Sequence, residues 1–262
     1  MKKICIYGKG GIGKSTTVAN LAASCAKMGL RVAVVGCDPK ADSTRNIIGK
    51  KIPTILSILH QGNKDDIFQT GFMGIKCFES GGPLPATGCA GRGIVVAINE
   101  IQSKNLLENI DVVFYDVLGD VVCGGFATPL REDVADLVYI VTTSDFMSLY
   151  AANNISRGIE KYATTGKVKL GGIIHNGRSS VANRELVENL ATRIGTEVIG
   201  FVPMSEEITK AELKRKTVVE YNPCGEASQA FEALAKIVVS KDVGTVPTPM
   251  TDDDLEELCM TF

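Results

Sequence analysis

The chain has 262 residues, of which 45% are hydrophobic and 22% are charged, and this globular composition excludes a disordered chain, a fibrous repeat and a bare coiled coil. Its 28 basic and 30 acidic residues give a net charge of −2, and it contains no tryptophan. Neither a strong positive field nor an aromatic stacking surface therefore points to a nucleic-acid partner. No stretch approaches the roughly 18 consecutive apolar residues of a membrane span, so we expect no membrane partner.

The beginning of the chain shows no targeting segment. The apolar run after the first three residues ends at Gly8, which is too short for the core of a signal peptide. We therefore expect a cytoplasmic protein. In that compartment its eight cysteines are expected to be thiols or metal ligands rather than disulfides.

Apolar runs predict the strands of a sheet, and they cover residues 3–7, 31–36, 112–115, 137–141, 170–174 and 198–202. Apolar residues at helical spacing predict helices over 16–28, 94–102, 149–162, 184–194 and 228–239. This alternation favours an α/β fold with a mostly parallel sheet and helices on both faces. No linker divides the chain, so we expect a single domain over residues 1–262. Residues 245–262 are expected to form a docked tail, with Thr251 capping a short helix over 252–258.

The segment Gly8-Lys9-Gly10-Gly11-Ile12-Gly13-Lys14-Ser15 matches the phosphate-binding pattern G-x-x-x-x-G-K-[ST], between a predicted strand and a predicted helix. Its glycines let the backbone wrap around a phosphate with N–H groups pointing inward, and the helix start adds a positive end. We expect Lys14 to reach the β and γ phosphates and Ser15 to bind Mg²⁺. The alternative is a plain glycine-rich turn.

Two acidic loops follow predicted strands. In the first, Asp38 and Asp42 are candidates to hold a Mg²⁺ water, to orient the attacking water or to pair with Lys9. The alternative is that Asp42 or Ser43 caps a helix.

In the second loop, Asp116 begins the pattern Asp-x-x-Gly, which ends at Gly119 and suits a γ-phosphate sensor. Two loops that report the nucleotide state indicate a switch rather than a metabolic kinase.

Two cysteines, Cys89 and Cys123, have glycines close by and lie 34 residues apart (123 − 89), unlike a C-x-x-C zinc pattern. Small neighbours allow an inorganic cluster to approach the backbone. Two ligands per chain do not complete a four-cysteine cluster, but two chains that meet at a twofold axis do. The alternative is a pair of buried, inert thiols. Cys123 follows Asp120 by three residues, so a switch movement would reach a cluster ligand directly. The other cysteines are interpreted as structural.

These motifs, together with residues 79–83, 88–93 and 115–127, resemble the nitrogenase iron protein family, whose members are deviant P-loop NTPases. The resemblance extends over about residues 2–239. It implies a homodimer that binds ATP and Mg²⁺ and shares one [4Fe-4S] cluster, held here by Cys89 and Cys123. It also implies that low-potential electrons pass from an upstream donor to a separate catalytic partner.

The resemblance also implies residue roles. The nucleotide and Mg²⁺ would be bound by Gly10, Gly11, Ile12, Gly13, Lys14, Ser15, Thr16 and Asp42. Switch I would contain Asp38, Lys40 and Asp42, and switch II would contain Asp116, Gly119 and Asp120. Lys9 would act across the dimer interface, Asp120 would position the attacking water, and Arg92 would lie on the partner-docking face. Asn176, after a predicted strand, is a candidate adenine contact or a turn residue.

The family has several branches, and the likeness favours the reductase of the Ni-sirohydrochlorin a,c-diamide reductive cyclase, which serves nickel-tetrapyrrole assembly in methanogens. Nitrogenase reductase is the alternative. Thr209 and Phe231 stand where nitrogenase members usually carry Gln and Tyr near the adenine, and Ala41 stands where the chlorophyll branch usually has His. A partitioning-type scaffold ATPase is a third possibility, which accounts for Lys9 but not for Cys89 and Cys123.

Overall fold

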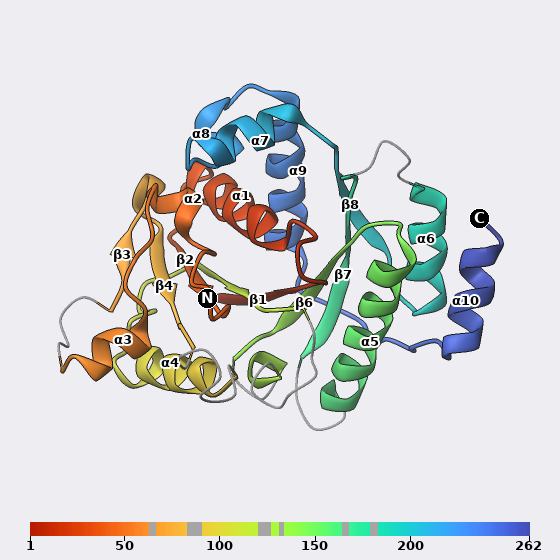
Figure 1. Cartoon of the computed structure of the whole chain (residues 1–262), viewed down its shortest axis with the longest axis horizontal. Coiled ribbons are helices and arrows are strands. Elements are labelled where there is room, and N and C mark those ends of the chain that lie inside the picture. Colours follow the sequence, from red (N-terminus) through yellow and green to blue (C-terminus); the bar gives the residue numbers. More distant parts are fainter. Residues whose placement is uncertain (63–66, 83–90, 120–126, 131–133, 164–167, 179–182) are drawn as a thin grey trace.

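The described residues form one eight-stranded sheet (Figure 1). The computed structural model describes residues 1–62, 67–82, 91–119, 127–130, 134–163, 168–178 and 183–262. The strands are β1 (Lys2–Tyr7), β2 (Val32–Gly36), β3 (Gln69–Thr70), β4 (Lys76–Glu79), β5 (Val112–Asp116), β6 (Leu137–Thr142), β7 (Lys169–Asn176) and β8 (Val198–Val202). Their order is β3-β4-β2-β5-β1-β6-β7-β8, and every neighbouring pair is parallel except β3 and β4. The predicted mostly parallel sheet is confirmed.

Helices cover both faces of this sheet, as predicted. The helices are α1 (Lys14–Lys27), α2 (Arg45–Ile48), α3 (Ile55–His60), α4 (Gly91–Ser103), α5 (Phe146–Ala163), α6 (Arg184–Arg193), α7 (Glu206–Leu213), α8 (Val218–Tyr221), α9 (Glu226–Ser240) and α10 (Asp252–Met260), with short 3₁₀ turns η1 (Phe72–Gly74) and η2 (Thr128–Leu130). One face carries α1, α8 and α9, and the other carries α3, α4, α5 and α6 (Figure 1). None of the helices in the described part of the chain is long and apolar enough to span a bilayer.

The central strand β1 separates two hydrophobic cores. Ile4 and Ile6 pack into the core beneath α1 and α9, whereas Cys5 and Tyr7 pack into the core on the opposite face. Side chains alternate between the faces of a strand, so a strand buried on both sides has a continuous apolar sequence. This is the physical reason why the apolar runs located the inner strands correctly.

The sequence pattern missed β3 and β4, as well as the short helices α2, α3, α7 and α8. Strand β4 has only four residues, and it begins and ends with the charged residues Lys76 and Glu79. Glu79 is nevertheless fully buried, so β4 is an inner strand without an apolar pattern. Strand β7 also continues past its predicted end, through the buried polar residues His175 and Asn176.

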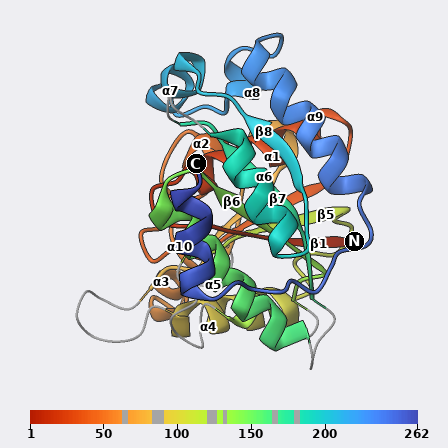
Figure 2. The same cartoon turned by 90° about the vertical axis from the view of Figure 1, so that its right-hand side faces the viewer.

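The C-terminal segment docks on α5 and α6 (Figure 2). The Thr251 hydroxyl accepts a hydrogen bond from the Asp254 N–H, which confirms the predicted cap, and the helix extends to Met260. The buried Asn153 side chain on α5 donates to the Met250 carbonyl and accepts from the Met250 N–H, both at 2.9 Å. A side-chain amide thus pairs with the backbone that leads into α10.

We expect Asn153→Ala to weaken this docking. The Met250 N–H loses its buried acceptor, whereas the Met250 carbonyl keeps a bond from Arg157. The free energy of unfolding should fall by about 1–3 kcal/mol in urea titrations, the cost of one unsatisfied buried group. The neighbouring variant Asn154→Ala, which loses a partly buried contact with Arg157, should change it by less than about 0.5 kcal/mol. Equal effects of the two variants would contradict the role of Asn153.

Candidate functional site

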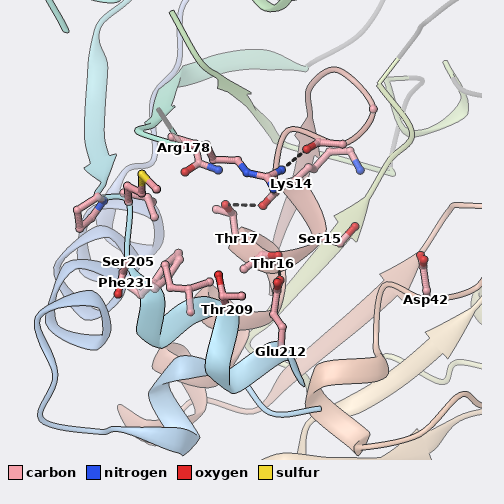
Figure 3. Close-up of a pocket in the computed structure, with 18 of the residues that line it drawn as sticks. Lys14, Ser15, Thr16, Thr17, Asp42, Arg178, Ser205, Thr209, Glu212 and Phe231 are labelled. Atoms are coloured by element: carbon pink, nitrogen blue, oxygen red, sulfur yellow. Dashed lines mark hydrogen bonds between the residues drawn. The ribbon is translucent and has the colours of Figure 1, made fainter. Parts of the chain in front are cut away.

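A cavity of about 620 Å³ opens where several parallel strands end at the same edge of the sheet (Figure 3). Many of the predicted site residues line it together, namely Gly10, Gly11, Gly13, Lys14, Ser15, Thr16, Asp38, Lys40, Asp42 and Asn176. They come from the loops after β1 and β2, the first turn of α1 and the end of β7. The fold thus gathers residues that are up to 166 positions apart in the sequence (176 − 10).

The glycine-rich loop is held by Asn176. The Asn176 side chain donates to the Ile12 carbonyl at 2.7 Å, and Ile12 itself is buried. Gly13, which precedes α1, has a φ of 92°, and a Cβ there would lie 2.4 Å from the Asn176 amide nitrogen. Only glycine meets both conditions without strain. Asn176 therefore shapes the loop, and its contact with adenine stays a prediction.

Lys14 and Asp116 form a buried ion pair in the loop. The Lys14 Nζ lies 2.9 Å from Asp116 Oδ1, and the two side chains are 7% and 0% exposed. The other carboxylate oxygen of Asp116 is buried and has no hydrogen-bond partner among the residues that the structure describes. Because Asp116 ends β5 and Lys14 begins α1, the pair joins the phosphate loop to the second acidic loop. Lys14 lines the cavity, and Asp116 keeps an unused acceptor that could bind a Mg²⁺-bound water, so these residues fit a Mg-nucleotide.

The second acidic loop touches the phosphate loop directly. A Cβ on Gly119 would lie 1.8 Å from the Gly8 carbonyl oxygen, so no other residue fits at this position. The segments that follow β1 and β5 therefore pack backbone against backbone.

The first acidic loop is anchored by Glu79, a residue that the sequence analysis did not assign to the site. Glu79 Oε1 accepts hydrogen bonds from the N–H and the hydroxyl of Thr44, both at 2.7 Å. Glu79 Oε2 is buried and, within the part of the chain that the structure describes, has no hydrogen-bond partner. Burial raises the pKa of Glu79 to about 7, although the bonds from Thr44 oppose this shift. Because β4 has no apolar pattern, the sequence offered no signal for this buried carboxyl group.

The alternative interpretations of the first acidic loop are wrong. Helix α2 has Thr44 at its N-cap position, so neither Asp42 nor Ser43 caps it. Lys9 pairs with Asp145, whose Oδ1 lies 3.4 Å from the Lys9 ammonium, and not with Asp38 or Asp42. The Lys9 side chain is 38% exposed, and its action across a dimer interface stays a prediction.

The far end of the cavity is formed by α7, α9 and the segment after β8 (Figure 3). Phe231 and Thr209, the predicted adenine-side residues, line this end. Two further residues, which the sequence analysis did not assign to the site, contact the phosphate loop and the start of α1. Glu212 accepts a hydrogen bond from the Thr16 hydroxyl, and Arg178 donates to the Gly11 carbonyl. Glu212 lies on α7, a helix that the pattern did not predict.

Three predicted residues, Cys89, Asp120 and Cys123, lie outside the described residues. Arg92 is exposed in the first turn of α4. The other six cysteines carry no bond to each other, and four are buried, namely Cys5, Cys25, Cys37 and Cys77. Burial raises the pKa of the Cys25 thiol to about 12, which keeps it protonated and unreactive. A structural role is therefore supported for the buried cysteines.

Comparison with known proteins gives a family and a fold. A family model described as "4Fe-4S iron sulfur cluster binding proteins, NifH/frxC family" matches residues 2–262. The chain is 50% identical to the nitrogenase iron protein of Methanococcus voltae over 98% of this chain and 95% of that protein.

Among solved structures, the septum site-determining protein MinD of Pyrococcus horikoshii with Mg-ADP has a TM-score of 0.74 at 20% identity, covering 91% of this chain and 96% of that chain. Cobyrinic acid a,c-diamide synthase of Mycobacterium smegmatis, with an ATP analogue and magnesium, has a TM-score of 0.66 at 18% identity, covering 94% and 99%. These two structures show similarity of fold alone.

We expect Glu79→Gln to remove a pH-dependent part of the stability. The folded chain holds the Glu79 proton up to about pH 7, whereas the unfolded chain releases it near the ordinary value of 4.5. The free energy of unfolding therefore falls as pH rises between these values, by at most about 1.4 kcal/mol per unit, and is constant above them. Urea titrations from pH 5 to pH 8 should give a flatter profile for Glu79→Gln than for the wild type. The exposed variant Glu108→Gln should keep the wild-type slope, and an unchanged slope in Glu79→Gln would refute the assignment.

Proposed function

The chain belongs to the NifH/frxC family of 4Fe-4S iron–sulfur cluster binding proteins, and on this premise we propose that it is an ATP-dependent reductase. Members of this family bind a 4Fe-4S cluster, ATP and Mg²⁺, and work as homodimers that pass electrons to a separate catalytic component. Residues 1–262 would act as one nucleotide-switch domain with residues 245–262 as its tail. The observation that carries the ATP dependence is the buried ion pair of Lys14 with Asp116 beside the cavity.

The phosphates of ATP would lie on the N–H groups of Gly10 to Gly13, with the Lys14 ammonium at the β and γ phosphates. Ser15 and Thr16 begin α1 beside them, and Ser15 would hold Mg²⁺. The adenine would lie toward Thr209 and Phe231, at the opposite end of the cavity from Asp42 (Figure 3).

Lys14 would exchange its carboxylate partner for the γ-phosphate when ATP binds. Asp116 would then be a buried carboxylate without a counter-charge, a state that costs several kcal/mol. The segment after Asp116 would therefore rearrange, either toward Mg²⁺ or away from the loop. Gly119 packs on Gly8 and precedes Cys123 by only four residues (123 − 119), so this rearrangement would reach a cluster ligand.

Other residues would serve hydrolysis, cluster binding and contact with the catalytic component. Asp38 and Asp120 would orient the water that attacks the γ-phosphate, and Lys9 would contact the nucleotide of the facing subunit. Cys89 and Cys123 from two chains would supply four thiolates to a [4Fe-4S] cluster, which accepts and donates one electron at a time. The exposed Arg92 would lie on the surface that meets the catalytic component.

For the catalytic component we propose the Ni-sirohydrochlorin a,c-diamide reductive cyclase, with an upstream low-potential donor. This choice rests on the family likeness and on Thr209 and Phe231, which line the cavity where typical nitrogenase members carry other residues. The second candidate is a nitrogenase, because the relative from Methanococcus voltae that is 50% identical bears that name. A partitioning ATPase is supported only by fold similarity at 20% identity.

We expect Lys14→Gln to reduce ATP hydrolysis by about 10² to 10³, because the phosphates lose their buried cation. The reduced protein should keep the electron paramagnetic resonance signal of its cluster. Because Lys14→Gln also leaves Asp116 without a partner, the double variant Lys14→Gln with Asp116→Asn serves as the folding control. Hydrolysis near the wild-type rate in a correctly folded variant would show that the loop assignment is wrong.

We expect anaerobically reduced protein with MgATP to support turnover when it is mixed with the tetrapyrrole cyclase component, and not with a nitrogenase catalytic component. Cys89→Ser and Cys123→Ser should each lose the cluster absorbance and the reduced-state signal, whereas Cys224→Ser, at an exposed cysteine, should keep both. Turnover with the nitrogenase component alone would favour the second candidate. A cluster that persists in both Cys89→Ser and Cys123→Ser would refute the ligand assignment.

A further inference from the structure

A second hollow lies beside the nucleotide cavity. It has a volume of about 400 Å³ and is lined only by charged residues, namely Lys40, Asp42, Arg45, Lys51 and Arg215. Four cations and one carboxylate give it a net charge of +3 (4 − 1), although the whole chain has a net charge of −2. This local excess of positive charge attracts anions.

The four cations have no ion-pair partner among the residues that the structure describes. By contrast, Lys216, which follows Arg215 directly, pairs with Glu220 at 2.7 Å. Lys27 and Arg31, on the surface elsewhere, also pair with carboxylates at 2.6 and 2.7 Å. The hollow therefore gathers cations whose charge is balanced by Asp42 alone.

The backbone brings these residues together from segments distant in sequence. Lys40 and Asp42 lie in the loop after β2, Arg45 begins α2, and Lys51 follows that helix. Arg215 follows α7 with a φ of 57°, and its N–H donates to the Glu212 carbonyl at 2.9 Å. This left-handed turn meets the turn after α2, because a Cβ on Gly49 would lie 3.9 Å from the Arg215 carbonyl oxygen.

The hollow and the nucleotide cavity share two lining residues, Lys40 and Asp42. Asp42 lies on the Ser15 side of the cavity, away from Phe231 (Figure 3). Under the proposed function, this end receives the γ-phosphate. An anion that left this end past Lys40 would enter the hollow that Arg45, Lys51 and Arg215 line.

We propose that this hollow is an exit site for inorganic phosphate, a proposal that rests on the proposed ATP hydrolysis. Water adds to the γ-phosphorus, the bond to the bridging oxygen breaks, and the products are ADP and inorganic phosphate with release of the water's proton. The guanidinium groups of Arg45 and Arg215 present paired N–H donors that match phosphate oxygens, and Lys51 adds a mobile charge. Asp42 repels the anion, which keeps the affinity low enough for a product that must leave.

Direct binding of inorganic phosphate tests the site. The full-length dimer is loaded with Mg²⁺ and a non-hydrolysable ATP analogue, so that the γ-phosphate position is filled, and is titrated with phosphate by calorimetry. The triple variant Arg45→Gln/Lys51→Gln/Arg215→Gln should bind phosphate at least about eightfold more weakly, as expected for a loss of roughly two- to fivefold per cation. The single variants are measured as well, in case the triple variant does not fold. Lys50→Gln and Lys214→Gln, at exposed neighbours outside the hollow, are the matched controls and should bind as the wild type does.

Product release gives a second readout. Acid-quenched ATP cleavage should keep its wild-type rate in the triple variant, whereas phosphate release, followed with a fluorescent phosphate sensor, should slow by at least threefold. Equal phosphate binding in the wild type and the triple variant, or unchanged release, would overturn the exit site while leaving ATP hydrolysis intact. Loss of binding to an acidic partner protein without loss of phosphate binding would assign the hollow to that partner instead. Absence of ATP cleavage in the wild type would refute the proposed function itself.

Discussion

A buried ion pair between Lys14 and Asp116, whose side chains are 7% and 0% exposed, joins the first helix of the chain to its fifth strand. Each charge is tolerated there only because the other is present, since an isolated ion in such a site costs several kcal/mol. A ligand with strong negative charge at Lys14 therefore changes the environment of Asp116, whatever the rest of the ligand is. Under the proposed function, phosphate binding at the first loop would in this way cause a change in the second.

The parallel sheet places the loops that surround this ion pair at one edge. Because the strands run in one direction, the loops after β1, β2 and β5 emerge at the same edge, and two cores hold the strands beneath them. The loop after β5 contacts the phosphate loop through close backbone packing, as at Gly119 on Gly8. The loop after β2 is instead held by buried hydrogen bonds from Thr44 to Glu79 at the end of β4.

The two hollows at this edge of the sheet differ in the chemistry of their linings. The larger combines glycine N–H groups, one buried lysine and an apolar end at Phe231, as a nucleotide requires. The smaller has only charged side chains and shares Lys40 and Asp42 with the larger. If the proposed ATP hydrolysis and phosphate exit hold, this division would let the chain bind a triphosphate firmly and release one product, because firm binding needs buried donors and release needs hydrated ones.

The sequence by itself determined the features with local physical causes. Apolar runs located the inner strands because those strands are buried on both faces, and the glycine-rich loop was identified because its residue types and its place between strand and helix suffice to wrap a phosphate. Resemblance to a family assigned Cys89 and Cys123, which lie outside the described residues. Only the tertiary structure decided the contacts between distant segments. Glu79 is buried although its carboxyl group is ionisable, Lys9 pairs with Asp145, and Arg215 and Lys51 line one hollow. These environments arise from packing between distant segments and leave no periodic signal along the chain.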